Sequence, residues 1–224
     1  MNLYPVTIVE NFYEDPDAVR TFALNQKYQY RHQLKDVPYV FPGARTKDLS
    51  VINKPLFDKV NHKIISLFHN SEYERMRWAI ATNFQSVSED YGRGIIHTDS
   101  NTVFAAVLYL SPDAPLDAGT SLFKPNKQFD QAAYEKALKE NDKRFAAGTI
   151  AMDTGYHSMF DEIVRINNVY NTLILYEGRH YHAANKFFGK TLKDSRLAQV
   201  FFVSSIDAQK HSSFPIWRSQ QIKI

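Results

Sequence analysis

Three residues of metal-binding type and one arginine are the part of this sequence that could do chemistry. His97 and Asp99 stand two positions apart, His182 comes much later in the chain, and Arg196 follows it. Side chains two positions apart on an extended segment point the same way, so His97 and Asp99 could hold one ion, with His182 supplied by a distant strand. Two neutral imidazoles and one carboxylate leave the opposite side of a metal open. That arrangement suits non-heme Fe(II), where a co-substrate and O₂ must both reach the metal.

Arg196 stands at the start of a predicted strand in which small and large side chains fall on opposite faces. It shares a face with Ala198 and Val200, whereas Leu197 and Phe201 share the other face. A guanidinium inside a barrel needs an anion, and small neighbours leave room for one. Because arginine binds a carboxylate through two parallel hydrogen bonds, this face favours a carboxylate ligand.

The elements that must position these residues are helices first and strands later. Asp15-Pro16 is typical of a helix start, and apolar residues recur at helical spacing from Pro55 to about Asn70. Another helix is predicted as an insertion at about residues 128–143. Short strands separated by turns are typical of a sandwich or a jelly roll. We predict strands, rich in β-branched and aromatic residues, at Arg77–Val87, Thr102–Leu110, Thr120–Phe123, Thr172–Tyr176 and Arg196–Ser204.

Composition excludes several classes of protein. The 224 residues are 44% hydrophobic and include 13 tyrosines and 16 phenylalanines, which is enough to bury a core and argues against disorder. There is no cysteine, so disulfides, zinc fingers and thiol nucleophiles are excluded, and a cytoplasmic location is expected. No apolar run is long enough for a membrane span, and the net charge of +3 is spread along the chain. We therefore expect neither a membrane nor a nucleic-acid partner; the oligomeric state stays open.

The order of these motifs resembles that of the Fe(II)/2-oxoglutarate-dependent dioxygenases, in particular the branch similar to prolyl hydroxylases. The resemblance covers about residues 77–204: His97-Thr98-Asp99, then a strand and a Gly-Thr turn from Val107 to Phe123, the segment Leu173–Gly178, His182 and Arg196. It implies an α+β, mainly β chain. The implied fold is a double-stranded β-helix (a cupin-like jelly roll) with N-terminal helices packed on one sheet. We expect a single domain over residues 1–224, with a helical support over about 1–76 and the β core over about 77–205.

The same resemblance implies a role for each residue. His97, Asp99 and His182 would bind Fe(II), Arg196 would pair with the distal carboxylate of 2-oxoglutarate, and Tyr109 would donate a hydrogen bond to that carboxylate. The implied reaction consumes O₂ and 2-oxoglutarate, releases succinate and CO₂, and hydroxylates a small molecule or a residue of a peptide or protein. The chain departs from the family in the long gap between His182 and Arg196.

Alternatives remain for the individual residues and for the function. His180 competes with His182 as the distal ligand, although the register of the preceding turn favours His182. Tyr109 could be a core aromatic, and Arg196 could pair with a carboxylate of the protein itself. The rival function is a cupin-like module that binds a metal or ligand without oxidising anything. Zinc-dependent hydrolysis is a weaker reading because it leaves Arg196 and Tyr109 without a role.

Overall fold

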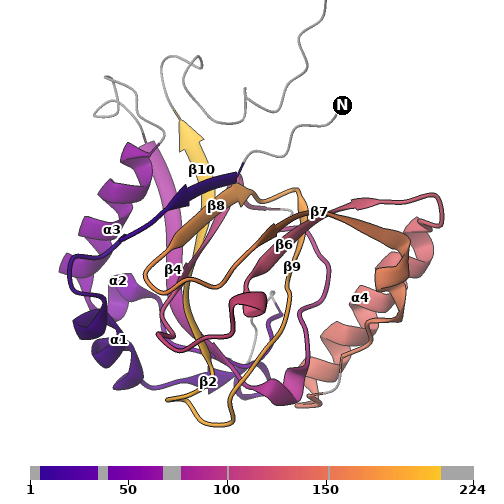
Figure 1. Ribbon diagram of the computed structural model, residues 1–224, viewed down its shortest axis with the longest axis horizontal. Helices are drawn as coiled ribbons and strands as arrows, with labels where there is room; N and C mark the ends of the chain where they lie inside the picture. The colour runs from indigo at the N-terminus through magenta and orange to yellow at the C-terminus, as the bar shows by residue number, and fades with distance from the viewer. Residues whose placement is uncertain (1–5, 35–39, 68–76, 100, 151, 208–224) are drawn as a thin grey trace, which may run out of the picture.

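Two antiparallel sheets face each other at the centre of the molecule (Figure 1). The structure, a computed structural model, describes residues 6–34, 40–67, 77–99, 101–150 and 152–207. Within these ranges the large sheet has seven strands, in the spatial order β1 (Val6–Val9), β8 (Leu173–Glu177), β5 (Phe104–Tyr109), β10 (Arg196–Asp207), β4 (Arg77–Val87), β3 (Ala44–Arg45) and β2 (Gln29–Tyr30). The small sheet has three strands, in the order β7 (Phe160–Ile166), β6 (Thr120–Pro125) and β9 (Tyr181–Ala184). The prediction of a mixed, mainly β chain is confirmed.

Helices cover the outer face of each sheet. The large sheet is covered by α1 (Pro16–Leu24), α2 (Leu49–Ile52) and α3 (Lys54–Ser66), and α4 (Gln131–Ala146) lies beside the small sheet (Figure 1). Each of the longer helices begins where a short polar side chain accepts a backbone N–H: Asp15 for α1, Asn53 for α3 and Asp130 for α4. Short 3₁₀ turns occur at Arg31–Gln33, Glu89–Tyr91, Leu116–Ala118 and Gly155–Met159.

The core has separate layers on the two faces of the large sheet. One layer joins the helices to the outer face and includes Val60, Ile64 and Phe201. The other fills the space between the sheets, and its buried members are Ala105, Val107, Tyr109, Leu122, Ile166, Ile174, Tyr176, Ala198 and Val200. This inner layer holds two tyrosines, so the interior between the sheets is not uniformly apolar.

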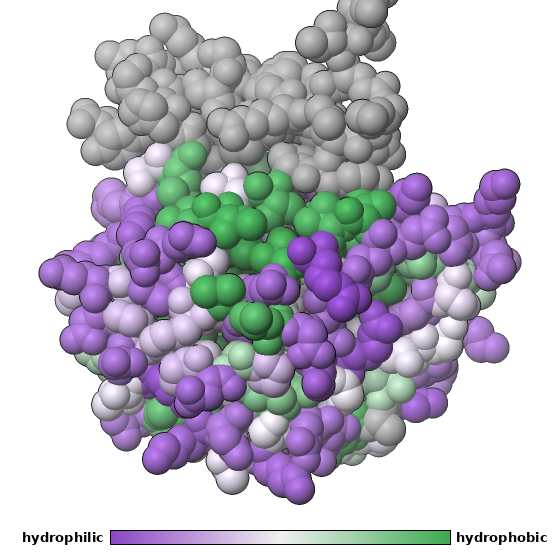
Figure 2. Space-filling model, viewed as in Figure 1, coloured by the Kyte–Doolittle hydropathy of each residue, from purple (hydrophilic) through white to green (hydrophobic). Residues whose placement is uncertain are grey.

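The surface agrees with this arrangement. The face shown in Figure 2 is largely hydrophilic, apart from a hydrophobic area over β1, β7 and β8. In that area Ile8 is exposed, and the partly buried Val6, Ile163 and Val164 pack against the inner layer. No helix in the described ranges is long and apolar enough to cross a bilayer.

The N-terminal region departs from the expected helical support over residues 1–76. It also contributes β1, β2 and β3, all of which join the large sheet. Strands β7 and β9 of the small sheet were likewise missed. The helix expected from Pro55 begins at Lys54 and runs to Ser66, while the residues that would complete its predicted end lie outside the described ranges. The insertion predicted at 128–143 is the helix Gln131–Ala146.

Candidate metal centre

Backbone pairing brings His97 beside His182. The two residues form an antiparallel bridge, in which the His97 N–H donates to the His182 carbonyl (3.1 Å) and the His182 N–H donates to the His97 carbonyl (2.9 Å). The turn between β8 and β9 fixes Asp99, because the Asp99 N–H donates to the Gly178 carbonyl at 2.7 Å. Gly178 lies against the backbone of Thr102, where a Cβ would stand 2.4 Å from the Thr102 carbonyl oxygen. Only glycine fits this close approach without a shift.

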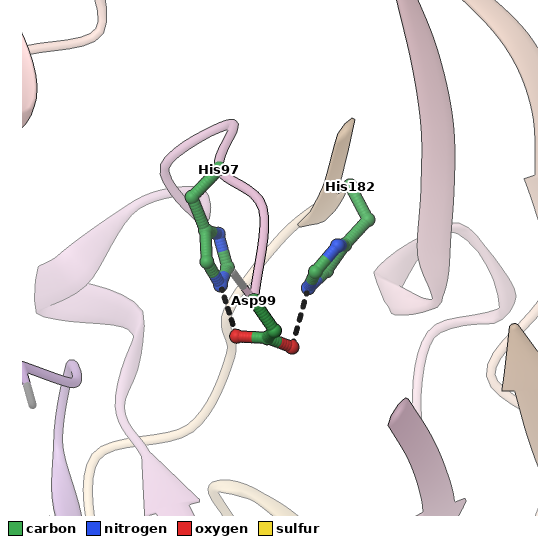
Figure 3. A group of neighbouring side chains, drawn as sticks. All are labelled: His97, Asp99 and His182. Carbon is green, nitrogen blue, oxygen red and sulfur yellow. Dashed lines mark ion pairs between the residues drawn. The ribbon is translucent and has the colours of Figure 1, made fainter. Parts of the chain in front are cut away.

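The three side chains converge on a common point (Figure 3). Asp99 Oδ1 lies 3.7 Å from His97 Nε2, and Asp99 Oδ2 lies 3.5 Å from His182 Nε2. One ligand atom from each residue falls within 4.8 Å of the other two. Two atoms bound to the same ion at about 2.1 Å are roughly 3 Å apart, so a small inward movement would give the spacing of a metal site. The structure thus brings together the three residues predicted as ligands.

Hydrogen bonds at the far side of each ring select the tautomer that a metal needs. His97 Nδ1 lies 3.0 Å from the Ile95 carbonyl, and His182 Nδ1 lies 2.9 Å from the His180 carbonyl. A carbonyl only accepts, so each Nδ1 carries the proton and each Nε2 presents a lone pair toward Asp99. Burial, together with the neighbouring His97, lowers the pKa of His182 to about 4. This imidazole is therefore neutral at neutral pH, the form that binds a metal.

The site is open on one side. The His182 side chain is 7% exposed and Asp99 17%, whereas His97 is 35% exposed. Access from solvent is therefore on the His97 side.

Arg196 and Tyr109 lie together in the inner layer of the core. Arg196 is 5% exposed, donates from Nε to the Ala118 carbonyl (3.1 Å), and has its Cζ 5.4 Å from the centre of the Tyr109 ring. Burial lowers the pKa of Arg196, a shift opposed by Tyr109. No carboxylate in the described ranges forms an ion pair with this guanidinium. A buried cation without a counter-charge is costly, so the position calls for an anion.

Tyr109, His180 and Tyr176 lie near the metal group or Arg196. Tyr109 is fully buried and donates to Thr120 Oγ1 at 2.9 Å. His180 stays outside the metal group; its Nε2 lies 3.2 Å from Glu177 Oε2. Analysis of the sequence missed Tyr176, whose ring centre is 4.7 Å from that of His182. The alternation in the segment Leu173–Glu177 could have found it, since Tyr176 shares the inner face with Ile174.

His157 makes the stability of the protein depend on pH. Its Nε2 accepts the Ile96 N–H at 3.3 Å beside the metal group, and burial lowers its pKa to about 4. The ordinary value of about 6.5 holds in the unfolded chain. The unfolded chain thus binds more protons as the pH falls from 6.5 toward 4, and stability is lost across that window. After allowing for its partial exposure, we expect His157 to cost about 1 kcal/mol of unfolding free energy between pH 7 and pH 5.

Urea unfolding of metal-free protein at both pH values tests this prediction. His157→Gln keeps an acceptor for the Ile96 N–H but cannot titrate, so its stability should fall less than that of the wild type. Other histidines, His182 included, are common to both proteins and cancel in the comparison. Equal losses in the two proteins would contradict the prediction.

The chain is similar in sequence to one family and in fold to several solved structures. A family model described as a family of unknown function (DUF6445) matches residues 2–195. No curated protein matches the sequence. Among solved structures, HygX from Streptomyces hygroscopicus, with nickel and 2-oxoglutarate bound, is similar at 11% identity and a TM-score of 0.52, covering 90% of this chain and 83% of HygX.

Two further solved structures are similar to a comparable degree. An oxidoreductase of the 2OG-Fe(II) oxygenase family from Burkholderia pseudomallei has 12% identity and a TM-score of 0.51, covering 89% of this chain and 84% of that one. The non-heme alpha ketoglutarate dependent carbocyclase SnoK from nogalamycin biosynthesis has 11% identity and a TM-score of 0.53, covering 89% and 80%. At these identities the likeness establishes a shared fold.

Proposed function

The chain belongs to the family of unknown function DUF6445, and we propose that it is an Fe(II)- and 2-oxoglutarate-dependent oxygenase. One observation carries the proposal: a His–Asp–His group and a buried arginine without a protein carboxylate occur in the same fold. A metal group alone would suit many ions. The added cation calls for an anionic partner, and 2-oxoglutarate has a carboxylate at each end.

The donor set fits Fe(II). His97, Asp99 and His182 would hold the ion, with two imidazole Nε2 atoms and one carboxylate oxygen as ligands. Bound Fe(II) would supply O₂ activation coupled to the decarboxylation of 2-oxoglutarate to succinate and CO₂. The carbonyls of Ile95 and His180 hold the proton of each imidazole on Nδ1, which leaves the lone pair of Nε2 free. The two imidazoles therefore need no proton transfer before they bind a metal.

Arg196 would hold the distal carboxylate of 2-oxoglutarate. Its guanidinium is oriented by the bond from Nε to the Ala118 carbonyl and by packing against Tyr109 and Phe187. Tyr109 would contribute its hydroxyl to the same carboxylate, exchanging its present bond to Thr120. Orienting one end of the co-substrate in this way fixes the direction in which the other end reaches the metal group.

We interpret the two sheets as a double-stranded β-helix and residues 1–224 as a single oxygenase domain similar to the prolyl hydroxylases. The substrate would be a small molecule or a residue of a peptide or protein, and the reaction a hydroxylation. The name of SnoK, a carbocyclase, illustrates that one fold hosts several reactions, so the substrate is assigned by analogy.

Anaerobic titration of the Fe(II)-loaded protein with 2-oxoglutarate tests the proposal. We expect a weak visible charge-transfer band, because a keto acid that chelates Fe(II) accepts charge from it. Glutarate, which has both carboxylates but no keto group, is the matched control and should give no band. Iron binding without a band on adding 2-oxoglutarate would overturn the proposal in favour of a cupin-like binding module.

A further inference from the structure

Tyr176 stands between the two halves of the proposed site and has had no role so far. It lies on β8 at the inner face, paired with Ala105 of β5, and is 2% exposed. Its ring packs against the ring of His182, with centroids 4.7 Å apart and planes at 54°. It also belongs to the same buried cluster as Tyr109.

The Tyr176 hydroxyl has no hydrogen bond to the residues that the structure describes, yet its oxygen is not fully enclosed, so it faces accessible space near the His182 ring. A phenol that faces such space can donate to a bound ligand. The hydroxyls of Tyr28 and Tyr134, by contrast, are enclosed without a partner. Its surroundings therefore single out Tyr176.

Contacts link the Tyr176 ring to both ends of the site. The ring packs against His182 at the metal end. It also shares a buried cluster with Tyr109, and the Cζ of Arg196 lies 5.4 Å from the centre of the Tyr109 ring. A neutral phenol can donate its proton to an anion bound between these residues.

We propose that the Tyr176 hydroxyl donates a hydrogen bond to the bound 2-oxoglutarate, as an anchor between the metal end and the Arg196 end. The proposal rests on the function proposed above. A molecule that reaches from a metal held by His182 to Arg196 would pass the Tyr176 ring, which contacts His182 and lies in the same cluster as Tyr109. The dicarboxylate would supply the acceptor that the protein lacks, and Tyr176 would supply a neutral donor that adds no further charge to the interior.

Calorimetric binding of 2-oxoglutarate to the Mn(II)-loaded protein tests the role of Tyr176. Tyr176→Phe keeps the ring against His182 and removes only the hydroxyl. We expect 2-oxoglutarate to bind about ten- to a hundredfold more weakly, the range for losing one hydrogen bond to a charged group. Mn(II) affinity should change less than about twofold, since Tyr176 is not a ligand. The melting temperature of the metal-free variant should equal or exceed that of the wild type, because no internal hydrogen bond is lost.

Tyr13→Phe is the matched control. The Tyr13 hydroxyl donates to Gln199 Oε1 at 2.7 Å on the other face of the sheet, so this variant should melt at a lower temperature and bind 2-oxoglutarate normally. Unchanged binding in Tyr176→Phe would overturn the anchor role, and a drop in melting temperature like that of Tyr13→Phe would assign Tyr176 a structural role instead. If the wild type itself fails to bind 2-oxoglutarate, the proposed function falls, and this inference falls with it.

Discussion

His182→Ala is expected to weaken Fe(II) binding about a hundredfold or more and to abolish 2-oxoglutarate turnover. Even the residues that orient a metal ligand change affinity by about 10- to 100-fold, and loss of a ligand costs more. His182 is also the most buried of the three side chains, so water has little access to the ligand position that the variant leaves empty. Anaerobic Fe(II) binding, followed by chelator competition, measures the loss, and succinate formation measures turnover.

His180→Ala is the control for this prediction. His180 is two residues away and contacts Glu177; its backbone carbonyl holds His182 Nδ1, and alanine retains that carbonyl. Its Fe(II) affinity should therefore stay near the wild-type value. A variant pair with the opposite behaviour, in which His180→Ala loses iron and His182→Ala retains it, would refute the assigned ligand set.

Arg196→Gln is expected to raise the 2-oxoglutarate concentration needed for half-saturation about a hundredfold. Hydrogen bonds to a charged group contribute about 1.5–3 kcal/mol each, and the variant loses a charge-assisted pair at one carboxylate. Fe(II) affinity should be unchanged, because Arg196 is not among the ligands. The charge-transfer titration of the variant measures both quantities in one experiment.

Arg165→Gln is the matched control for charge. Arg165 lies on β7, is exposed, and pairs with Glu162 through Nε at 2.8 Å. The Arg165→Gln variant loses one positive charge, as Arg196→Gln does, but we expect no change in its 2-oxoglutarate binding. A half-saturation concentration that rises equally in both variants would show a general effect of charge, and wild-type binding by Arg196→Gln would exclude Arg196 from the site.

The sequence permitted prediction of the residues that the structure groups, but less of the architecture around them. The spacing of His97 and Asp99, and the preference for His182 over His180, rest on strand alternation and turn register, both local properties. Strands β4, β5, β6, β8 and β10 were predicted because apolar, β-branched and aromatic residues are frequent in their sequences and turn residues separate them.

The shortest missed strands share a physical cause. β2 and β3 have two residues each, and β1 and β9 have four, too few for a periodic pattern to be recognised. Their strand conformation comes from pairing with partners far away in the sequence, such as Val6 with Tyr176. The seven-residue β7 was missed because its apolar residues are interrupted by Asp161, Glu162 and Arg165. Tyr176 was missed as a site residue because strand alternation places it on the inner face but does not give its contact with His182, which depends on how the two sheets face each other.

The backbone bridge between His97 and His182 determines when, during folding, a complete ligand set can exist. Until β9 has been synthesised and has paired beside His97, the chain offers only the imidazole and carboxylate of the His97-Thr98-Asp99 segment. Closing so long a loop is a slow, entropically costly event compared with forming a helix or a hairpin. Tight binding of an ion by all three residues would therefore be a late step, confined to chains in which β9 has already paired beside His97.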